Sequence, residues 1–262
     1  SREGTLWLNA SLRPDTALVS WIRTVIAEGQ AFLATSGNRV AAAWVPASFP
    51  PVHASSSGEI APALLDLNLP LKEEPVLSLM DWPFHIVAAQ KDLCRSSLEY
   101  RLRRGGYKLL DTRWKDVWIA DGAGADTAPV DVSPLVAFRT EDGPVILESG
   151  VSVLDFSFFR GPVYLGKGTK VIEHASVKDG VSTGRTCKIG GEIECAIMDS
   201  YSNKQHHGFL GHAFIGSWVN MGAGTSNSDL KNTYGSIQIT HSGQRIDTAM
   251  QFFGCVMGDY SK

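Results

Sequence analysis

The spacing of hydrophobic residues differs between the two halves of the chain. Up to about residue 112, apolar positions follow the periods of an ordinary α/β protein. Between residues 18 and 26 they recur at i, i+3, i+4, i+7 and i+8, which predicts an amphipathic helix. Asp15 or Thr16 is placed to cap this helix, and Gly29 is placed to end it.

Shorter apolar runs predict three strands, at residues 6–8, 31–34 and 40–45. The last two are joined by a predicted turn at residues 36–38, and the Pro- and Ser-rich residues 46–60 are predicted to form a loop. A second helix is predicted from a cap at Asp81 to about Leu102, where two consecutive glycines stop it. This half contains no phosphate-binding glycine motif, so by itself it indicates only a mixed α/β fold.

The second half of the chain repeats every six residues. Steps of six from Leu147 to Cys195 reach an apolar residue at all but one position, about twice the frequency that the 44% apolar composition predicts. The positions four further on, from Val151 to Ile193, all hold small or β-branched residues. Neither a helix nor a flat sheet has this period, whereas a stack of coils with short strands and a turn every six residues does. We therefore expect a solenoid.

Two tracts interrupt the six-residue register, at about residues 137–143 and 199–211. Such tracts are predicted to be loops that leave the stack, and loops of this kind often carry function. Glycine supports the division into two architectures, because 18 of the 26 glycines follow residue 140. Corners of a tightly wound coil need a permissive backbone.

Composition limits the possible functions. The net charge of −3 argues against a protein that binds nucleic acid by neutralising phosphates. No apolar run approaches the length of a membrane-spanning helix, and no signal sequence precedes the fold, so a cytoplasmic protein without membrane partner is expected. Four cysteines without a C-x-x-C pair predict buried, reduced thiols. The chain starts at Ser1 and stops without a closing helix, which we interpret as part of a longer parent.

The most specific motif runs from Gly208 to Thr225 and reads GFLGHAFIGSWVNMGAGT. It resembles the hexapeptide-repeat acetyltransferase domain of the bifunctional N-acetylglucosamine-1-phosphate uridyltransferase/glucosamine-1-phosphate acetyltransferase family. Residues 201–206 and 226–235 are closer to a sister group of sugar nucleotidyltransferases with the same two-domain plan. The resemblance covers about residues 144–260 and is weak before residue 112.

The resemblance implies the fold and the domain plan. Residues 1–112 are expected to be an incomplete α/β nucleotidyltransferase-like domain. Residues 113–262 are expected to be a left-handed parallel β-helix that lacks its last coils. Proteins of this family form trimers with sites between subunits, so a homotrimer is expected.

The resemblance also implies roles for individual residues. His206 falls at the position of the catalytic base, and Arg160 falls on the arginine that holds the sugar phosphate. Asn220 and Asn227 fall on asparagines that contact the amino sugar. Phe209 replaces a tyrosine and loses its hydroxyl group.

The implied donor and phosphate contacts are less complete. Ala223 falls where a backbone N–H meets the acyl donor, acetyl-CoA. A phosphate-binding lysine of the family pattern has no counterpart within residues 192–196, which puts the amino-sugar phosphate in doubt as substrate. Lys231 or Lys204 is a candidate for the missing charge.

The residue types suit acetyl transfer to an amine. The ammonium group must lose a proton before the amine attacks a thioester, and a histidine side chain, whose ordinary pKa is about 6.5, can accept that proton. Gly222, Ala223 and Gly224 can present backbone N–H groups to the oxyanion that forms. Glu194 is the candidate carboxylate that orients the histidine.

The expected function is therefore an enzyme of sugar-nucleotide biosynthesis. The β-helix would transfer an acetyl group from acetyl-CoA to an amino-sugar 1-phosphate. The parent N-terminal domain would couple a nucleoside triphosphate to a sugar 1-phosphate, with Mg²⁺ as a possible cofactor.

Two alternatives remain open. In the first, the β-helix is only a trimerisation and regulatory module, with Trp218 and Phe209 as interface aromatics. In the second, His174, His207 and His212 bind Zn²⁺, as in the γ-class carbonic anhydrases, which share the solenoid and use histidines from two subunits. The residues around these histidines match the acetyltransferase pattern better, so the metal site is the weaker alternative.

Overall fold

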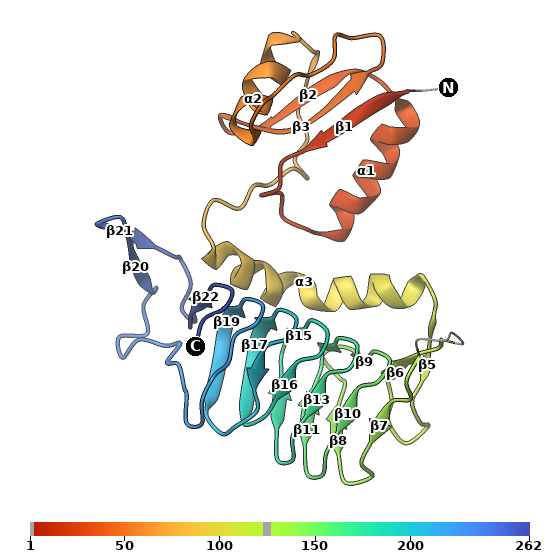
Figure 1. Cartoon of the computed structure of the whole chain (residues 1–262), viewed down its shortest axis with the longest axis vertical. Helices are drawn as coiled ribbons and strands as arrows, with labels where there is room; N and C mark the ends of the chain where they lie inside the picture. Colours follow the sequence, from red (N-terminus) through yellow and green to blue (C-terminus); the bar gives the residue numbers. More distant parts are fainter. Residues whose placement is uncertain (1–2, 123–126) are drawn as a thin grey trace. The chain divides into compact units, whose positions relative to one another are not determined.

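The computed structural model describes residues 3–122 and 127–262 and divides into two compact units, Ser1–Asp81 and Trp82–Lys262 (Figure 1). Unit 1 contains a mixed four-stranded sheet in the order β1-β3-β2-β4. Its elements are β1 (Gly4–Leu8), α1 (Thr16–Glu28), β2 (Phe32–Ser36), β3 (Arg39–Pro46), α2 (Ser57–Asp66) and β4 (Leu71–Lys72).

Both faces of the unit 1 sheet are covered. Successive residues of a strand point to opposite sides, so β2 and β3 feed two hydrophobic clusters. Phe32 packs with Val25 in the cluster on the α1 side, and Leu33 packs with Leu64 in the cluster on the α2 side. Each helix therefore buries its apolar stripe against one face of the same sheet.

The predicted elements of unit 1 are largely confirmed. The Asp15 side chain accepts a hydrogen bond from the Leu18 backbone N–H at 2.7 Å, and Gly29 ends α1 with a φ of 61°. The three predicted strands are present. The loop predicted for residues 46–60 ends earlier than expected, because α2 begins at Ser57. Its serines and Pro62 weaken the helix signal, whereas burial of Leu64 stabilises the helix.

The second predicted helix is present, but Asp81 does not cap it. α3 (Phe84–Arg103) follows Pro83 without a side-chain cap. The Asp81 carboxylate instead accepts a hydrogen bond from Arg39 at 2.6 Å within unit 1. The glycines at 105–106 both have positive φ, which confirms the predicted stop.

Unit 2 is a parallel β-solenoid, as the six-residue repeat predicts, and it is of the left-handed β-helix type that the resemblance implies. Its first two strands form an antiparallel hairpin, and the second of them pairs with the first coil of the solenoid. The remaining strands are β5 (Tyr107–Leu109), β6 (Val117–Ala120), β7 (Asp131–Val132), β8 (Ala137–Arg139), β9 (Val145–Leu147), β10 (Ser152–Val153), β11 (Phe158–Arg160), β12 (Val163–Leu165), β13 (Lys170–Val171), β14 (Ser176–Lys178), β15 (Val181–Thr183), β16 (Lys188–Ile189), β17 (Glu192–Met198), β18 (Asn203–Lys204), β19 (Phe209–Ile215), β20 (Gln238–His241), β21 (Gln244–Asp247) and β22 (Val256–Met257).

Three rows of parallel strands form the faces of the solenoid. Face A contains β7, β10, β13, β16 and β18, face B begins with β8, β11 and β14, and face C begins with β6, β9, β12 and β15. β17 and β19 each run through faces B and C. Ser152 pairs with Lys170, and Lys170 pairs with Lys188, so a regular coil contains three hexads.

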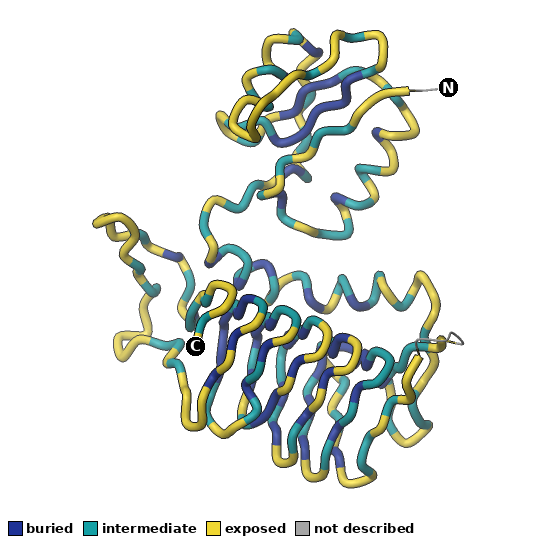
Figure 2. The backbone as a smooth tube through the Cα atoms, viewed as in Figure 1, coloured by how far each residue is buried: buried dark blue, intermediate teal, exposed yellow. Residues whose placement is uncertain are grey.

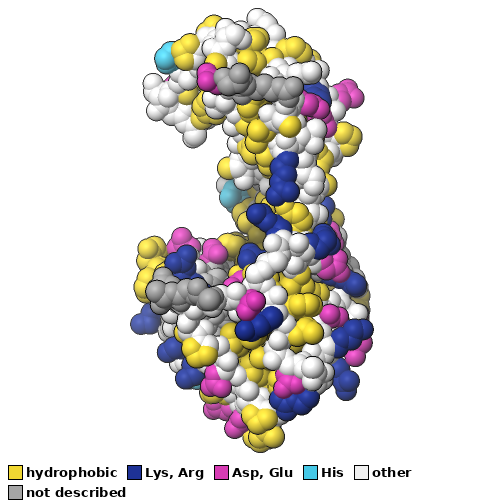
Figure 3. All heavy atoms as spheres, turned by 90° about the vertical axis from the view of Figure 1, so that its right-hand side faces the viewer, with side chains coloured by type: hydrophobic (Ala, Val, Ile, Leu, Met, Phe, Trp, Pro, Cys, Tyr) yellow, Lys and Arg dark blue, Asp and Glu magenta, His cyan; other side chains and the backbone are white. Residues whose placement is uncertain are grey.

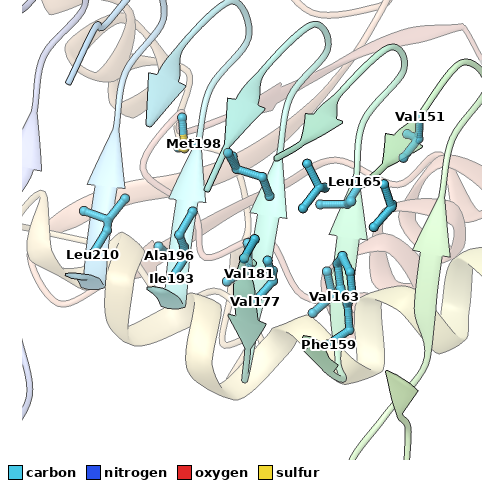
Figure 4. Packing of buried hydrophobic residues seen from close by; sticks show 14 of the residues in the cluster. Val151, Phe159, Val163, Leu165, Val177, Val181, Ile193, Ala196, Met198 and Leu210 are labelled. Atoms are coloured by element: carbon cyan, nitrogen blue, oxygen red, sulfur yellow. The ribbon is translucent and has the colours of Figure 1, made fainter. Parts of the chain in front are cut away.

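The hexad pattern predicts the interior correctly. Every position in the two series from Leu147 to Cys195 and from Val151 to Ile193 is at most 3% exposed. The buried residues line the strands and the exposed ones gather at the corners (Figure 2). Figure 4 shows Phe159, Val163 and Leu165 of one coil within this cluster, beside Val177 and Val181 of the next coil. Each coil therefore buries its apolar side chains against the next coil.

Helix α3 belongs to the solenoid unit. The Gln90 side-chain amide donates hydrogen bonds to the Gly180 carbonyl and the Ser182 hydroxyl, both at 2.7 Å. Leu98 packs with Ile146 on the outer side of face C. The compact units therefore divide at Asp81, before α3, whereas the sequence analysis divides the chain after residue 112.

The two tracts that interrupt the six-residue register do not leave the stack. Residues 137–139 form β8 within the stack, and only the following turn is longer than in other coils. Residues 199–211 also stay in the stack, because β18 pairs with β16 and β19 pairs with β17. The prediction that both tracts leave the solenoid is therefore wrong. A coil shortened by a few residues disturbs the sequence register without leaving the stack.

A segment that does leave the stack lies within residues 222–255, here called the excursion, although Asn227 near its start still donates a backbone hydrogen bond to Phe209 of β19. Phe214 of β19 pairs with Val256 of β22, so the chain departs and returns between neighbouring strands of face C. Within the excursion, β20 and β21 form an antiparallel hairpin, whose Ile239 packs with Phe84 of α3. The six-residue pattern did not predict this segment, because the strands before and after it are neighbours in the same stack.

Lys204 occupies an interior position of the solenoid. It pairs in register with buried Ile189, and its ammonium group donates hydrogen bonds to the carbonyls of Gly190, His206 and Gly208 at 3.2, 2.7 and 3.1 Å. Burial lowers the pKa of this amine. Lys204 therefore cannot supply a charge to a ligand. The prediction that it might replace the missing phosphate-binding lysine is wrong.

We expect Lys204→Met to destabilise unit 2 by about 1–3 kcal/mol, because it removes a donor from buried carbonyls while keeping a similar volume. Lys204→Gln, which retains a donor, should lose less. Urea unfolding followed by circular dichroism measures both. A Met variant as stable as the parent would show that the three hydrogen bonds contribute nothing net.

Two further sequence expectations can be compared with the structure. All four cysteines are free thiols, and burial raises the pKa of Cys94 to about 11 and that of Cys195 to about 12. None of the helices in the described ranges combines the length and the apolar character that crossing a bilayer requires.

Candidate functional site

A strip of polar side chains runs across face B. Strand register places Arg160, Lys178, Glu194 and Gly211 side by side on four successive coils. Neighbouring strands are about 4.8 Å apart, so the strip from Arg160 to Gly211 spans roughly 14 Å. Residues far apart in the sequence thus form one continuous surface.

The strip carries paired charges. The Arg160 guanidinium forms a bidentate ion pair with Asp179, in which Nε lies 2.6 Å from Oδ1. The Lys178 ammonium lies 2.8 Å from Glu192 and 3.2 Å from Glu194. Burial alone would lower the pKa of Lys178, but its hydrogen bonds to the two glutamates raise it above its ordinary value. Both cations are therefore held in fixed positions by carboxylates.

Lys178 is a second cation on the strip, one coil from Arg160. It stands in direct register with Arg160, so both side chains can approach one phosphate group. Residues 192–196, where a lysine is expected, lie one coil further along than Lys178. Counting one full coil of three hexads from Arg160 leads to Lys178, and this signal was present in the sequence.

The expected His206–Glu194 contact is not among the described interactions. Glu194 pairs with Lys178. The His206 ring is exposed on the corner between faces A and B, and its Nε2 lies 3.2 Å from the Gln205 side-chain nitrogen. Glu194 therefore forms an ion pair with Lys178, and the His206 ring remains exposed to solvent.

Phe209 and Asn227 meet at the Gly211 end of the strip. The Asn227 side chain accepts a hydrogen bond from the Gly211 N–H at 3.0 Å and donates one to the Gly211 carbonyl at 2.9 Å. A Cβ atom at Gly211 would lie 2.3 Å from the Phe209 ring, so only glycine fits here. Asn227 therefore clamps the backbone, and its amide is occupied by that task.

The glycine-rich loop at residues 222–224 lies beside the histidine corner. The Gly224 N–H donates a hydrogen bond to the His207 carbonyl at 3.1 Å. The three loop residues are exposed, and within the described ranges the Gly222 and Ala223 N–H groups donate no hydrogen bond. Two backbone donors are thus available next to His206 and His207.

Two other expected residues lie apart from the strip. Asn220 continues face A beyond Asn203 and is exposed. Lys231 lies in the excursion, where its ammonium donates a hydrogen bond to the Ser236 carbonyl at 2.7 Å. The structure thus brings His206, Phe209, Asn227 and the 222–224 loop together, but not Asn220 or Lys231.

A buried histidine–aspartate pair was not predicted. His212 Nδ1 lies 2.8 Å from Asp229 Oδ2, and the two side chains are 8% and 14% exposed. The His212 ring stacks on Phe252 at a centroid distance of 5.2 Å. No spacing rule links residues 212 and 229, because the excursion folds back to bring them together.

The histidines of the zinc alternative are not gathered within one chain. His174 stacks on Phe156, and His212 is paired with Asp229. Over residues 3–122 and 127–262, no three His, Cys, Asp or Glu side chains are grouped to hold a metal ion.

A separate pocket lies at the start of the solenoid. Its lining includes Arg95, Arg113, Trp114, Trp118 and Pro144. Arg95 pairs with Glu99, and Arg113 pairs with Asp111. Figure 3 shows positive and negative side chains similarly interspersed over this region of the surface. Arg95 and Arg113 of the pocket are thus neutralised locally.

Taken together, the geometry defines unit 2 as a parallel β-solenoid with hexapeptide repeats and a polar strip on one face. In comparisons with known proteins, no protein-family model matches the chain and no curated protein matches it.

Proposed function

We propose that unit 2 transfers an acetyl group from acetyl-CoA to the amine of an amino-sugar 1-phosphate. The observation that carries this proposal is the face B strip, which aligns Arg160 and Lys178 with a corner that holds His206 and the 222–224 loop. Hexapeptide solenoids are common among acyltransferases, and the motif from Gly208 to Thr225 resembles that class. The fold is equally compatible with a trimerisation module, so the strip decides our preference.

The two cations are suited to bind the phosphate of the acceptor. Arg160 can present two parallel N–H groups, and Lys178 adds a point charge one coil further on. Their carboxylate partners hold both side chains in place when no ligand is bound. A phosphate would compete with Asp179 and the two glutamates for these cations.

The histidine corner is suited to the chemical step. The exposed imidazole of His206 can accept the proton that the acceptor ammonium must lose. The free N–H groups of Gly222 and Ala223 can stabilise the oxyanion formed when the amine attacks the thioester. The CoA thiolate then leaves, and the proton held by His206 can pass to it.

The α/β fold of unit 1 supports the wider proposal only in outline. Its mixed sheet with a helix on each face is consistent with part of a nucleotidyltransferase-like domain. In the full-length protein we propose that such a domain joins a nucleoside triphosphate to the sugar 1-phosphate.

The test is to incubate the full-length protein with acetyl-CoA and glucosamine 1-phosphate and to follow free thiol. We expect His206→Ala to lower kcat by about 10²- to 10⁴-fold, the usual contribution of a general base. His207→Ala is the matched control, because it removes a neighbouring exposed imidazole from the same corner. The control should retain most of the activity.

Three results would count against the proposal. Absence of thiol release in the parent protein would favour the trimerisation module, whose signature is a trimer by light scattering. Thiol release that is unaffected by His206→Ala would remove the histidine from the mechanism. Stoichiometric zinc in the purified protein would favour the carbonic anhydrase-like alternative.

A further inference from the structure

A second polar surface lies on face A and on the corner between faces C and A, away from the face B strip. Lys167 and Lys170 lie on one coil, and Arg185 and Lys188 lie at the equivalent positions of the next. We call these four residues the basic patch. All four are exposed, and within residues 3–122 and 127–262 none of them forms an ion pair or side-chain hydrogen bond.

The unpaired state of the basic patch contrasts with that of four other cations of unit 2. Arg160, Lys178, Arg95 and Arg113 each pair with a carboxylate. Four free cations on two adjacent coils create a local positive field in a chain whose net charge is −3. Such a field favours a ligand with more than one negative charge.

Exposed aromatic side chains continue the same corner on the later coils. Tyr201, Trp218 and Tyr260 are 37%, 56% and 77% exposed, and we call them the aromatic column. The Tyr201 and Trp218 rings are stacked, with centroids 4.7 Å apart and planes 19° from parallel. The Tyr201 N–H donates a hydrogen bond to the Arg185 carbonyl at 2.9 Å, so the column starts where the basic patch ends.

The aromatic column occupies strained backbone. Its three residues have φ values of 66°, 60° and 60°. Earlier coils carry Gly150, Gly168 and Thr186 at this corner. A bulky side chain is disfavoured in the left-handed region, and such residues concentrate where a site needs them. A solvent-exposed ring gains little burial there, so stability does not explain the choice.

We propose that this edge of the solenoid binds a nucleoside that carries two or more phosphates. The phosphates would lie on the basic patch, and the flat base would stack on the aromatic column. Outward-facing Asn203 and Asn220 continue the row that begins with Lys170 and Lys188, and they offer hydrogen bonds to the sugar or base. Asp199 and Asp259 lie at the aromatic end and repel phosphates, so they fix the direction of the ligand.

Two sources provide this chemistry, a free nucleoside diphosphate and the phosphorylated adenosine of a CoA carrier. The site uses residues other than those of the face B strip, and only if CoA is its ligand does the inference rest on the proposed acetyl transfer. Its test is therefore direct binding, measured by isothermal titration calorimetry on the whole chain. The probes are ADP, CoA, pyrophosphate and adenosine.

We expect ADP or CoA to bind more tightly than pyrophosphate or adenosine, and the tighter of the two identifies the source. Lys170→Glu/Lys188→Glu should weaken binding at least about tenfold, and the loss should shrink as salt rises. Trp218→Gly should weaken it roughly 5- to 150-fold, the usual loss for one base–aromatic stack. Glycine suits the backbone at position 218, so this variant should fold.

Matched controls keep the test specific. Lys91→Glu/Arg103→Glu changes the net charge equally on the exposed surface of α3. Phe156→Gly removes an exposed aromatic residue of positive φ from a different corner. Both controls should bind like the parent. No binding of any probe, equal loss in the control variants, or pyrophosphate binding as tight as ADP and unaffected by Trp218→Gly would each overturn the proposal.

Discussion

Replacing Phe159 with alanine is expected to destabilise unit 2 by about 3–5 kcal/mol. The Phe159 side chain is fully buried and is among the largest side chains in the solenoid interior. Its ring stacks on Phe138 of the preceding coil at 5.0 Å, and its backbone pairs with Val177 of the following coil. A cavity at this position therefore weakens the contacts of three coils together, because each coil is buried only by its neighbours.

Phe156→Ala is the matched control for this prediction. Phe156 is the same residue type three positions earlier, but it is 57% exposed and stacks only on His174 at the corner. We expect its effect to stay within about 0.5 kcal/mol. The measurement is the urea midpoint of each variant at an unchanged slope. Equal losses of unfolding free energy in the two variants would contradict the assignment of Phe159 to the core and Phe156 to the surface.

Replacing His212 with alanine is expected to cost about 3–5 kcal/mol and to release the excursion from the solenoid. The substitution leaves the Asp229 carboxylate buried without its partner and removes the ring stacked on Phe252. The same region holds two backbone hydrogen bonds, from Phe253 to the Asp229 carbonyl and from Gly254 to the His212 carbonyl, both at 2.9 Å. Loss of the His212–Asp229 pair should therefore weaken both of these backbone hydrogen bonds.

Hydrogen exchange measures this effect locally, since the Phe253 and Gly254 amides should exchange faster in the His212→Ala variant. The control is the double variant His212→Ala/Asp229→Asn, which removes the unpaired charge as well. It should be more stable than His212→Ala alone. A double variant that is less stable by the full sum of its single changes would show that the two side chains are not coupled.

The excursion also links stability to the proposed activity. It carries Asn227, which clamps Gly211 at the end of the strip, and the 222–224 loop with its two free N–H groups. Loosening the His212–Asp229 contact should therefore lower acetyl transfer even though neither residue has been assigned to the chemical step. The two effects can be separated, because hydrogen exchange is measured without substrate.

Local patterns were sufficient to predict the elements and the interior. The helix that begins at Asp15 and ends at Gly29 follows from apolar spacing and capping alone. The hexad series predicts buried residues because every regular coil places the same position inside. These predictions succeed where a structural requirement repeats at a fixed spacing.

Predictions that depended on the length of a coil were less successful. The coil that joins Lys188 to Asn203 is shorter than its neighbours, so residues 199–211 lose the register although they remain in the stack. The excursion escaped notice for the opposite reason, because face C resumes at Val256 after a long detour. Only pairing between strands distinguishes a short coil from a segment that leaves the fold.

The sequence by itself determined that the second half is a solenoid, which positions face inward, and where the glycine-rich corner lies. These features follow from side-chain volume and backbone freedom, which act locally at each repeat. The tertiary structure decided which charges meet. It joined Glu194 to Lys178 rather than to His206, and it paired His212 with Asp229. Such contacts depend on the number of residues in each coil and on the return path of the excursion, and no local pattern records either.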